Sequence, residues 1–254
     1  LLDACDRPYI DFVFAQLHHP HKSELWIPGE IDYTGEVIGR LENFSTECEK
    51  PSVHFFGHTH GYSRGQSRDH THLWVNVATA GGNIDYWGEY EQADYDEFTV
   101  TQDEYGFVVL EVTAGDNPAF SLRRIGRGDE DFTAPNELRD QIEVRLHNTP
   151  PQTPQALFPS GDGLNPNCIV FSSSPFDDPD GDLHGATQWQ ISNNCDDFSR
   201  PITDRWRQHQ NWFGGRDLQE DDNLADETVD QLNPETSYCW RVRHRDRALA
   251  WSQW

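Results

Sequence analysis

Residues 53–61 read Val53-His54-Phe55-Phe56-Gly57-His58-Thr59-His60-Gly61, a mostly apolar run that stops at a glycine and continues directly into two histidines. Short apolar runs bounded by glycine are typical of buried β-strands. A second such run, Ile10–Leu17, ends at His18-His19-Pro20-His21. The two runs therefore predict two strands, each ending in a cluster of imidazole side chains.

The segment between these runs predicts a helix. Residues 35–48 place Val37, Leu41 and Phe44 at helical spacing, with charged residues between them. Strand, helix and strand in this order predict a crossover unit, for which the right-handed form is the default. Further strands are predicted at Leu73–Thr79, Phe98–Thr101 and Phe107–Val112. The residues between the last two, Gln102–Gly106, predict a hairpin that joins them.

The two strand ends carry the chemistry. Strands of an open α/β sheet present ligands just beyond their C-terminal ends, so we expect the histidines to converge. In His58-x-His60 we expect an extended chain whose flanking glycines let both imidazoles reach a metal. Imidazole suits zinc, iron or manganese, and two metals about 3.5–4 Å apart clamp an in-line displacement at phosphorus. A lone histidine is usually a surface or capping residue, but five at two adjacent strand ends favour metal.

The pattern resembles the purple acid phosphatases, a type of calcineurin-like metallophosphoesterase. In that family one strand ends in a ligand histidine followed by His- or Ser-Pro, and the next ends in Gly-His-x-His-x-Tyr-x-Arg, here Gly57–Arg64. A Gly-rich loop ending in Gly-Asn follows, here Val75–Asn83, and Tyr105–Val112 matches the closing hairpin. The resemblance implies an α/β (α+β) metallophosphoesterase sandwich that is incomplete at its N-terminus. It also implies two divalent or trivalent metal ions, Fe, Zn or Mn.

Carried over residue by residue, the resemblance implies that His18 and His58 bind one metal and His60 the other. His19 stays outside this ligand set, because the family fills its position with either Ser or His. Arg64 and Asn83 are the implied substrate-binding residues.

Two departures from the family pattern are visible. Residues 24–28 replace a stretch that usually carries substrate-facing histidines, so His21 or Lys22 is the candidate substitute and His21 the candidate catalytic residue. The family's earlier motifs, Asp-x-His, Gly-Asp-x-x-Tyr and Gly-Asn-His, supply the bridging aspartate and the remaining ligands and are not found in this sequence. The chain begins at Leu1 and contains no methionine. We therefore expect the C-terminal portion of a longer enzyme, inactive as given.

A proline-rich stretch, Asn148–Pro154, is typical of an interdomain connector. The sequence after it resembles an all-β fibronectin type III domain, with strands expected at Cys168–Phe171 and Ala186–Ile191. Leu232–Tyr238 fits that family's Leu-x-Pro-x-Thr-x-Tyr approach to a later strand. The predicted division is a phosphoesterase part at 1–147, a linker at 148–154 and a sandwich at 155–254 that lacks its last strand.

The five cysteines are interpreted from strand faces. Cys168 and Cys239 alternate with apolar residues expected in the core, so a bridge between them across the sandwich is disfavoured. Strands C and F of this fold are antiparallel neighbours, which brings Cys195 near Cys239. We predict Cys195–Cys239 as the first disulfide, Cys5–Cys48 as a second candidate and Cys168 as the free thiol. Disulfides indicate an oxidising location, whether extracellular, periplasmic or on the cell surface.

Composition limits the partners. The formal net charge is −25 and only two residues are lysine. Such a chain repels nucleic acids and anionic membranes. The sequence also has no apolar run of about eighteen residues, so membrane insertion is excluded. The expected partner is a small phosphate ester. By analogy, the C-terminal domain would attach the enzyme to a surface, a glycan or another protein.

Three polar segments have an ordinary alternative interpretation. Asp177–Asp182 resembles a calcium loop but lacks the later bidentate glutamate, so an Asp- and Gly-rich turn is favoured over calcium. His70-x-His72 repeats the metal-binding spacing, but solvation at a strand edge is favoured. The acidic run Asp94–Glu97 is interpreted as a solvated loop.

The preferred function is hydrolysis of phosphate esters at two metals. One alternative is an extracellular binding or adhesion protein with a degenerate phosphoesterase-like domain. Another is a nucleotidase or a cyclic-nucleotide phosphodiesterase, which share the Gly-His-x-His ending. The Tyr62/Arg64 and Gly82-Asn83 matches favour the acid phosphatase branch over the latter.

Overall fold

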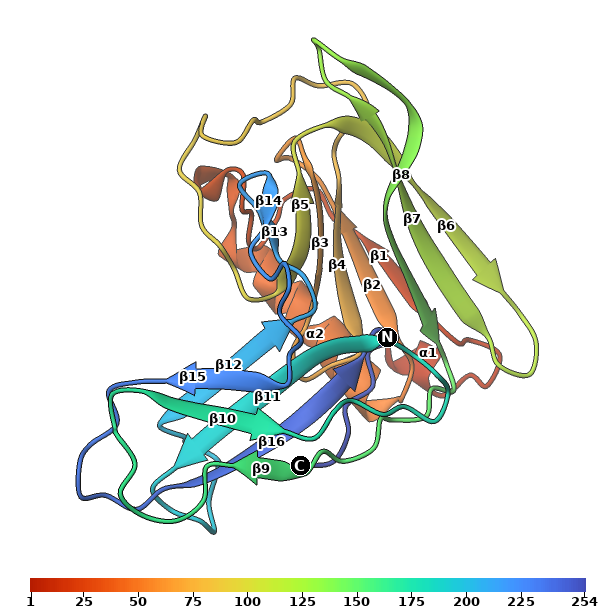
Figure 1. The fold of residues 1–254 in the computed structure, drawn as a ribbon. Helices are drawn as coiled ribbons and strands as arrows, with labels where there is room; N and C mark the ends of the chain where they lie inside the picture. The colour runs from red at the N-terminus through yellow and green to blue at the C-terminus, as the bar shows by residue number, and fades with distance from the viewer. The chain divides into compact units, whose positions relative to one another are not determined.

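The computed structural model describes the backbone of residues 1–254 and every side chain except that of Leu2. The chain divides into two compact units, and its regular structure is mostly β (Figure 1). The first unit holds Leu1–His147 and Gln210–Glu220, and the second holds Asn148–His209 and Asp221–Trp254. The segment Gln210–Glu220 therefore packs with the first unit, although it lies inside the range predicted for the second domain.

The elements of the first unit are α1 (Leu2–Cys5), β1 (Val13–Gln16), the 3-10 helix η1 (Ile27–Gly29), α2 (Asp32–Glu47), β2 (Ser52–Phe56), β3 (Tyr62–Gln66), β4 (His72–Val77), β5 (Phe98–Gln102), β6 (Tyr105–Thr113), β7 (Ala119–Gly128), β8 (Thr133–Arg145), β13 (Trp212–Phe213) and β14 (Arg216–Asp217). Seven strands form one mixed sheet in the order β1-β2-β4-β3-β5-β13-β14. Strands β1, β2 and β4 are parallel, whereas β3 is antiparallel to β4 and β5. The predicted strand–helix–strand unit is confirmed, and it ends β1 and β2 at one edge of the sheet.

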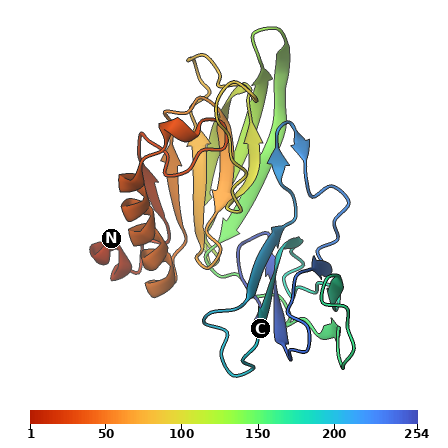
Figure 2. The same ribbon diagram turned by 90° about the vertical axis from the view of Figure 1, so that its left-hand side faces the viewer.

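Helix α2 covers one face of this sheet (Figure 2). Its inner side buries Ile38, Leu41 and Phe44, and Ile38 packs with Phe56 of β2 and with Trp74 of β4. Val37, which we predicted on the inner side, is only half-buried, because Ile38 has the better i, i+3 spacing to Leu41. In the described part of the chain, no helix combines the length and the apolar character that a bilayer crossing needs.

A separate antiparallel sheet, β6-β7-β8, packs on the other face. The predicted hairpin between β5 and β6 is wrong, because β6 pairs with β7 along its whole length while β5 stays in the mixed sheet. Gly106, which we interpreted as a turn residue, serves a close approach of two strands. A Cβ atom there would lie 2.1 Å from the carbonyl oxygen of Ile125.

Side-chain contacts hold the two sheets of the first unit together. Phe12 and Phe14 pack edge-on against Phe120 of β7, with ring centroids 5.1 and 5.4 Å apart. The Tyr62 hydroxyl donates to Asp140 of β8 at 2.6 Å, and the Arg64 guanidinium donates to both oxygens of the same carboxylate. The first unit therefore has three layers: a helix, a mixed sheet and an antiparallel sheet.

The second unit consists of strands alone: β9 (Ala156–Phe158), β10 (Ile169–Ser173), β11 (His184–Ser192), β12 (Thr203–Gln208), β15 (Asp226–Val229) and β16 (Cys239–Asp246). They form two antiparallel sheets in the orders β15-β10-β9 and β12-β11-β16. Strands β10 and β11 fall where sequence predicted them. The core holds Ile169, Phe171, Trp189, Ile191, Val229, Leu232 and Val242. The unit is a small β-sandwich.

The cysteine predictions are confirmed. Disulfides join Cys5 to Cys48 and Cys195 to Cys239, with Cα atoms 5.3 and 5.2 Å apart. Cys168 is free and exposed. Strand β11 pairs antiparallel with β16, so Ser192 lies opposite Cys239 and the chain just beyond β11 carries Cys195 to its partner.

Candidate metal centre

The hydrogen-bond ladder between β1 and β2 continues beyond both strands. The Leu17 amide donates to the Phe55 carbonyl at 2.8 Å, and the Gly57 amide donates to the His18 carbonyl at 3.0 Å. These two bonds bring the residue after Gly57 beside His18. The parallel pairing of β1 and β2 thus creates the cluster, as the sequence predicts for adjacent strand ends.

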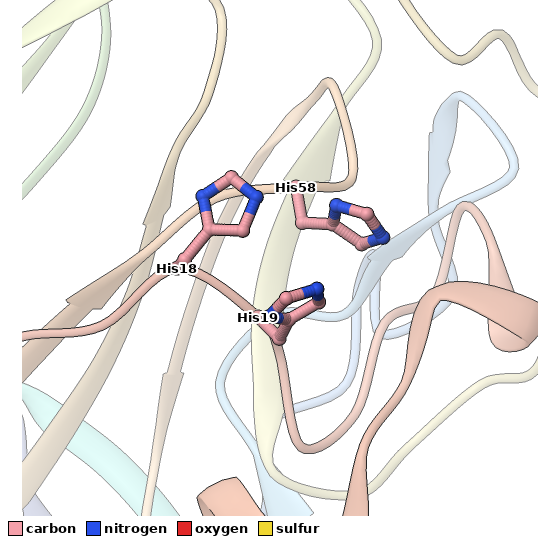
Figure 3. Close-up of side chains that lie close together, drawn as sticks. All are labelled: His18, His19 and His58. Atoms are coloured by element: carbon pink, nitrogen blue, oxygen red, sulfur yellow. The ribbon is translucent and has the colours of Figure 1, made fainter.

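Three imidazoles meet at this edge of the sheet. The ligand nitrogens of His18, His19 and His58 all lie within 4.8 Å of one another. The ring centroids of His18 and His58 are 5.2 Å apart, and those of His19 and His58 are 4.3 Å apart. Figure 3 shows His18 and His19 on the segment after β1, with His58 opposite them on the turn after β2. A metal bonded at about 2.0–2.1 Å to each ring is within reach after small side-chain rotations.

The backbone at His58 differs from the extended chain that we predicted. His58 has a φ of 71°. The Thr59 amide donates to the Gly57 carbonyl, and the Gly61 amide donates to the Thr59 carbonyl, so the chain makes two tight turns in succession. A left-handed conformation at a residue with a Cβ costs about 1–2 kcal/mol. The turns therefore aim His58 toward His18 at the expense of local strain.

The electrostatics of His58 suit a metal ligand. Partial burial, followed by the neighbouring rings of His19 and His18, lowers its pKa below the ordinary value. A lowered pKa keeps the imidazole neutral near pH 7, with a lone pair to donate. The donor set at this edge is thus three imidazole nitrogens, which fits zinc, iron or manganese better than magnesium or calcium.

His19, which we left out of the predicted ligand set, belongs to the observed cluster. Its carbonyl accepts a hydrogen bond from the Thr34 hydroxyl at 3.1 Å, and the following Pro20 carbonyl accepts one from the Ile31 amide at 3.0 Å. The start of α2 thereby holds the segment that carries His18 and His19. The sequence position of His19, next to His18, could have indicated a ligand role. We left it out because the family that the sequence resembles has either Ser or His at this position.

His60, predicted to bind a second metal, lies outside the group of three. Its Nδ1 lies 2.6 Å from the Asn83 carbonyl oxygen. A carbonyl oxygen can only accept a hydrogen bond, so Nδ1 carries the proton and donates. The lone pair is therefore on Nε2, the arrangement typical of metal-ligating histidines. The ring rests on Gly82, where a Cβ would lie 2.6 Å from it. Asn83, predicted to bind substrate, is exposed and contributes its carbonyl to His60.

The structure does not bring Arg64 or His21 to this cluster. Arg64 is 2% exposed and is committed to Asp140, so it joins two sheets. The His21 ring packs against Gly35 and lies 6.2 Å from the Trp74 ring, and its Nδ1 is buried without a hydrogen-bond partner. Lys22, the alternative to His21, pairs with Glu97 at 2.6 Å.

Sequence reasoning missed Asn76 as a positioning residue. Its side-chain amide donates to both the carbonyl and the hydroxyl of Thr59, each at 2.9 Å, and its own oxygen accepts from the Ala78 amide. Asn76 is 1% exposed. Because Thr59 lies between His58 and His60, Asn76 fixes the turn that carries both. A buried asparagine in an otherwise apolar strand was the available signal.

The second His-x-His pair is structural, and our expectation of strand-edge solvation is wrong for His72. His72 is fully buried, and its Nδ1 lies 2.7 Å from the Ser52 hydroxyl. His70 is half-buried, and its Nδ1 lies 2.7 Å from the Thr46 hydroxyl. The two rings are thus separated, one inside the sheet and one outside it.

The acidic run Asp94–Glu97 is also more engaged than the expected solvated loop. Asp94 accepts hydrogen bonds from Asn211, beside β13, and Glu97 holds Lys22. These contacts fasten the loop to the rest of the first unit.

In the second unit, Asp178, Asp182 and Asp246 bring carboxylate oxygens within 4.8 Å of one another. Asp178 accepts from the amides of Asp180 and Asp182, which is the geometry of an Asp-rich turn. Burial, and to a smaller extent Asp182, raises the pKa of Asp246 to about 6. Asp246 comes from β16 and lies outside the predicted loop. Calcium binding there stays the less favoured prediction.

Comparisons with known proteins do not assign this site to a family. No protein-family model matches the chain. No curated protein matches it either. Among solved structures, one described as GAP50, the anchor in the inner membrane complex of Plasmodium, is similar over 55% of this chain and 40% of its own, at 13% identity and a TM-score of 0.36. The chain thus spans well under two thirds of that protein, and a similarity at this level carries no argument about fold or activity.

Proposed function

We propose that the chain is the C-terminal portion of a metal-dependent phosphoesterase of the purple acid phosphatase type, followed by a fibronectin type III-like domain. The observation that supports this most directly is the convergence of His18, His19 and His58 at the ends of two parallel strands. The three-layer first unit and the β-sandwich of the second unit agree with that architecture.

In this proposal His18 and His58, with His19 beside them, hold one metal ion, and Nε2 of His60 faces a second. The ions, Fe, Zn or Mn, would supply a bound hydroxide at neutral pH and neutralise charge on the phosphoryl oxygens. The side chains of the protein keep the two histidines ready to bind these ions. The lowered pKa of His58 keeps its lone pair available, Asn83 fixes the tautomer of His60, and Asn76 holds Thr59, the residue between the two histidines.

The substrate in this proposal is a small phosphate ester. The net charge of −25 favours a compact, weakly charged ester over a polyanion. The two disulfides agree with an extracellular, periplasmic or cell-surface location. The sandwich would attach the enzyme to a surface, a glycan or a protein partner.

Metal titration tests the proposal. The chelator-treated chain is titrated with Zn²⁺ by calorimetry and with Co²⁺ by visible absorption. We expect saturable binding that weakens at least about 100-fold in His18→Ala and in His58→Ala, because each loses one imidazole ligand. His70→Ala is the matched control, since His70 is a half-buried histidine outside the cluster. Equal affinity in all three variants contradicts the proposal.

Activity provides the second measurement. The chain as given is expected to hydrolyse an aryl phosphate poorly or not at all, because the sequence lacks the bridging aspartate of the resembling family. Rapid metal-dependent turnover that survives His58→Ala would show that the chemistry takes place elsewhere.

A further inference from the structure

Two aromatic side chains outside the histidine motifs extend from His58, the first beside His58 and the second beside the first. The Trp26 ring centroid lies 5.2 Å from that of His58, and the Tyr90 ring centroid lies 5.7 Å from that of Trp26. Trp26 is half-buried and Tyr90 is 43% exposed. The three rings thus form a continuous row that runs from the metal cluster to the surface.

The position of Trp26 is fixed by its surroundings. Its carbonyl accepts from the Gly29 amide at 3.1 Å, and the next residue, Ile27, donates its amide to the Glu91 carbonyl at 3.0 Å. The indole lies directly on Gly29, where a Cβ would come within 2.6 Å of Cε3. The bond between Ile27 and Glu91 also joins the two segments that carry Trp26 and Tyr90. The row is therefore held by backbone contacts and does not depend on side-chain packing alone.

Tyr90 follows a tight turn. The Glu89 amide donates to the Tyr86 carbonyl at 3.1 Å, and Gly88 supplies the positive φ of 84° that the turn needs. The adjacent Glu89 carboxylate raises the pKa of Tyr90, which keeps the phenol neutral. Glu89 also accepts from the Tyr86 amide. Its charge is thus already engaged at the outer end of the row.

The chemistry of the row selects one class of ligand. Indole and phenol faces bind flat rings by offset stacking, and this attraction does not require charge on the ligand. A negatively charged group is disfavoured by the strongly acidic chain. The Glu89 carboxylate at the outer end of the row already accepts a hydrogen bond from the Tyr86 amide, so we take the flat ring faces, rather than this charge, as the binding element. A neutral, planar ring fits the row best.

We propose that Trp26 and Tyr90 bind the leaving group of the substrate, and that this group is a neutral planar aromatic ring. The inference rests on the proposed function, because His58 must hold the metal that binds the phosphoryl end. The predicted substrates are monoesters of an aromatic alcohol or of a nucleoside, which share a planar ring. The distance of Trp26 from His58 places the ring next to the phosphoryl group.

Binding of phosphonates to the Zn²⁺-loaded full chain tests the proposal without turnover. Phenylphosphonate and cyclohexylphosphonate match in size, but only the first is planar and aromatic. We expect calorimetry to show phenylphosphonate binding about tenfold tighter. Trp26→Leu and Tyr90→Leu should bring this ratio close to one, whereas Trp26→Phe should preserve most of it. Tyr33→Leu is the control, because Tyr33 is an exposed tyrosine on α2.

The outcomes separate the two proposals. If Zn²⁺ binds but the two phosphonates bind equally, or the ratio survives Trp26→Leu and Tyr90→Leu, the aromatic row is not a leaving-group site. Tighter binding of choline phosphate than of phenylphosphonate overturns the inference in favour of a cation. If Zn²⁺ binding itself is unaffected by His58→Ala, the proposed function fails and the inference falls with it. Adenosine monophosphate and phenyl phosphate are then compared as competitors of phenylphosphonate. The tighter competitor shows whether the ring comes from a nucleoside or from an aromatic alcohol.

Discussion

His54 and His58 lie four residues apart on one segment, and their surroundings are opposite. His54 is inside β2, is fully buried and shares a 2.9 Å hydrogen bond with His72. His58 lies just beyond the strand and faces His18 and His19, and none of these three rings has a hydrogen bond to a described side chain. The role of each histidine therefore follows from what satisfies its ring nitrogens. Inside the sheet a neighbouring histidine pairs with Nδ1 of His54, whereas at the edge a metal can take the place of such a partner.

His54 and His58 are both kept neutral, but the neutral form has a different role in each. Burial, with a smaller contribution from His21, lowers the pKa of His54 to about 3, and burial also lowers the pKa of His72 well below its ordinary value. A charge between two strands would cost far more than the hydrogen bonds return. At the edge, the smaller lowering at His58 preserves a lone pair for a ligand. The same residue type thus serves packing in one place and coordination in the other.

Acid unfolding should show the largest effect. The unfolded chain protonates His54 near its ordinary pKa of 6.5, whereas the folded chain resists protonation down to about 3. The stability contribution is therefore complete above pH 6.5 and is lost as pH falls toward 3. One buried histidine accounts for on the order of 4 kcal/mol between pH 6.5 and 3.5. Urea unfolding at several pH values should show a shallower pH slope in His54→Leu than in wild type. His58→Ala should change the slope much less, because the pKa of His58 is lowered less than that of His54. Equal slopes in wild type and His54→Leu would refute this explanation.

His72→Ala should be the next largest change. It opens a cavity between β2 and β4, leaves Nδ1 of His54 without its partner and removes one of the hydrogen bonds of the Ser52 hydroxyl. We expect a loss of about 3 kcal/mol in the free energy of unfolding. Zn²⁺ affinity should stay unchanged wherever the variant is folded. A His72→Ala chain as stable as wild type, or one that has lost Zn²⁺ binding, would erase the distinction between interior and edge.

His58→Gly should give the smallest effect and the opposite sign. Glycine adopts the φ of 71° without strain, so we expect a gain of about 1 kcal/mol in stability. His58→Ala keeps the Cβ and should show no such gain. Both variants should lose Zn²⁺ affinity equally. Thermal unfolding of the pair measures the strain, and identical stabilities would show that the turn is not strained.

The same contrast explains what the sequence could and could not predict. Apolar runs ending in histidine were sufficient to place β1, β2 and their shared edge, because parallel strands must end together. Asn76 escaped prediction because its role depends on the Thr59 backbone, which is close in space but 17 residues away in sequence. Arg64 lies on a strand whose inward face meets a second sheet, and no local pattern reveals which sheet lies opposite. Long-range contacts, rather than local propensity, decided these cases.

The junction after β5 shows the same limit. Only Asp103 and Glu104 separate β5 from β6, and a two-residue link between strands is usually a hairpin. Here the chain changes sheets at that point, because β7 offers β6 a longer pairing. The cysteines were predictable for the converse reason. Their partners are set by strand order and face, which the alternation of residues reports directly.

The β13–β14 hairpin has a consequence for biosynthesis. It completes the mixed sheet of the first unit, yet about 110 residues separate Gln102 at the end of β5 from Trp212 in β13. At roughly 5–20 residues per second, a ribosome exposes the outer edge of β5 for about 6–20 s before its partner emerges. An unpaired strand edge is a template for aggregation during that interval.

The chain also passes between the units at His147/Asn148, His209/Gln210 and Glu220/Asp221. A protease that cuts the proline-rich connector therefore leaves residues 1–147 held to the rest of the chain by the non-covalent packing of residues 210–220.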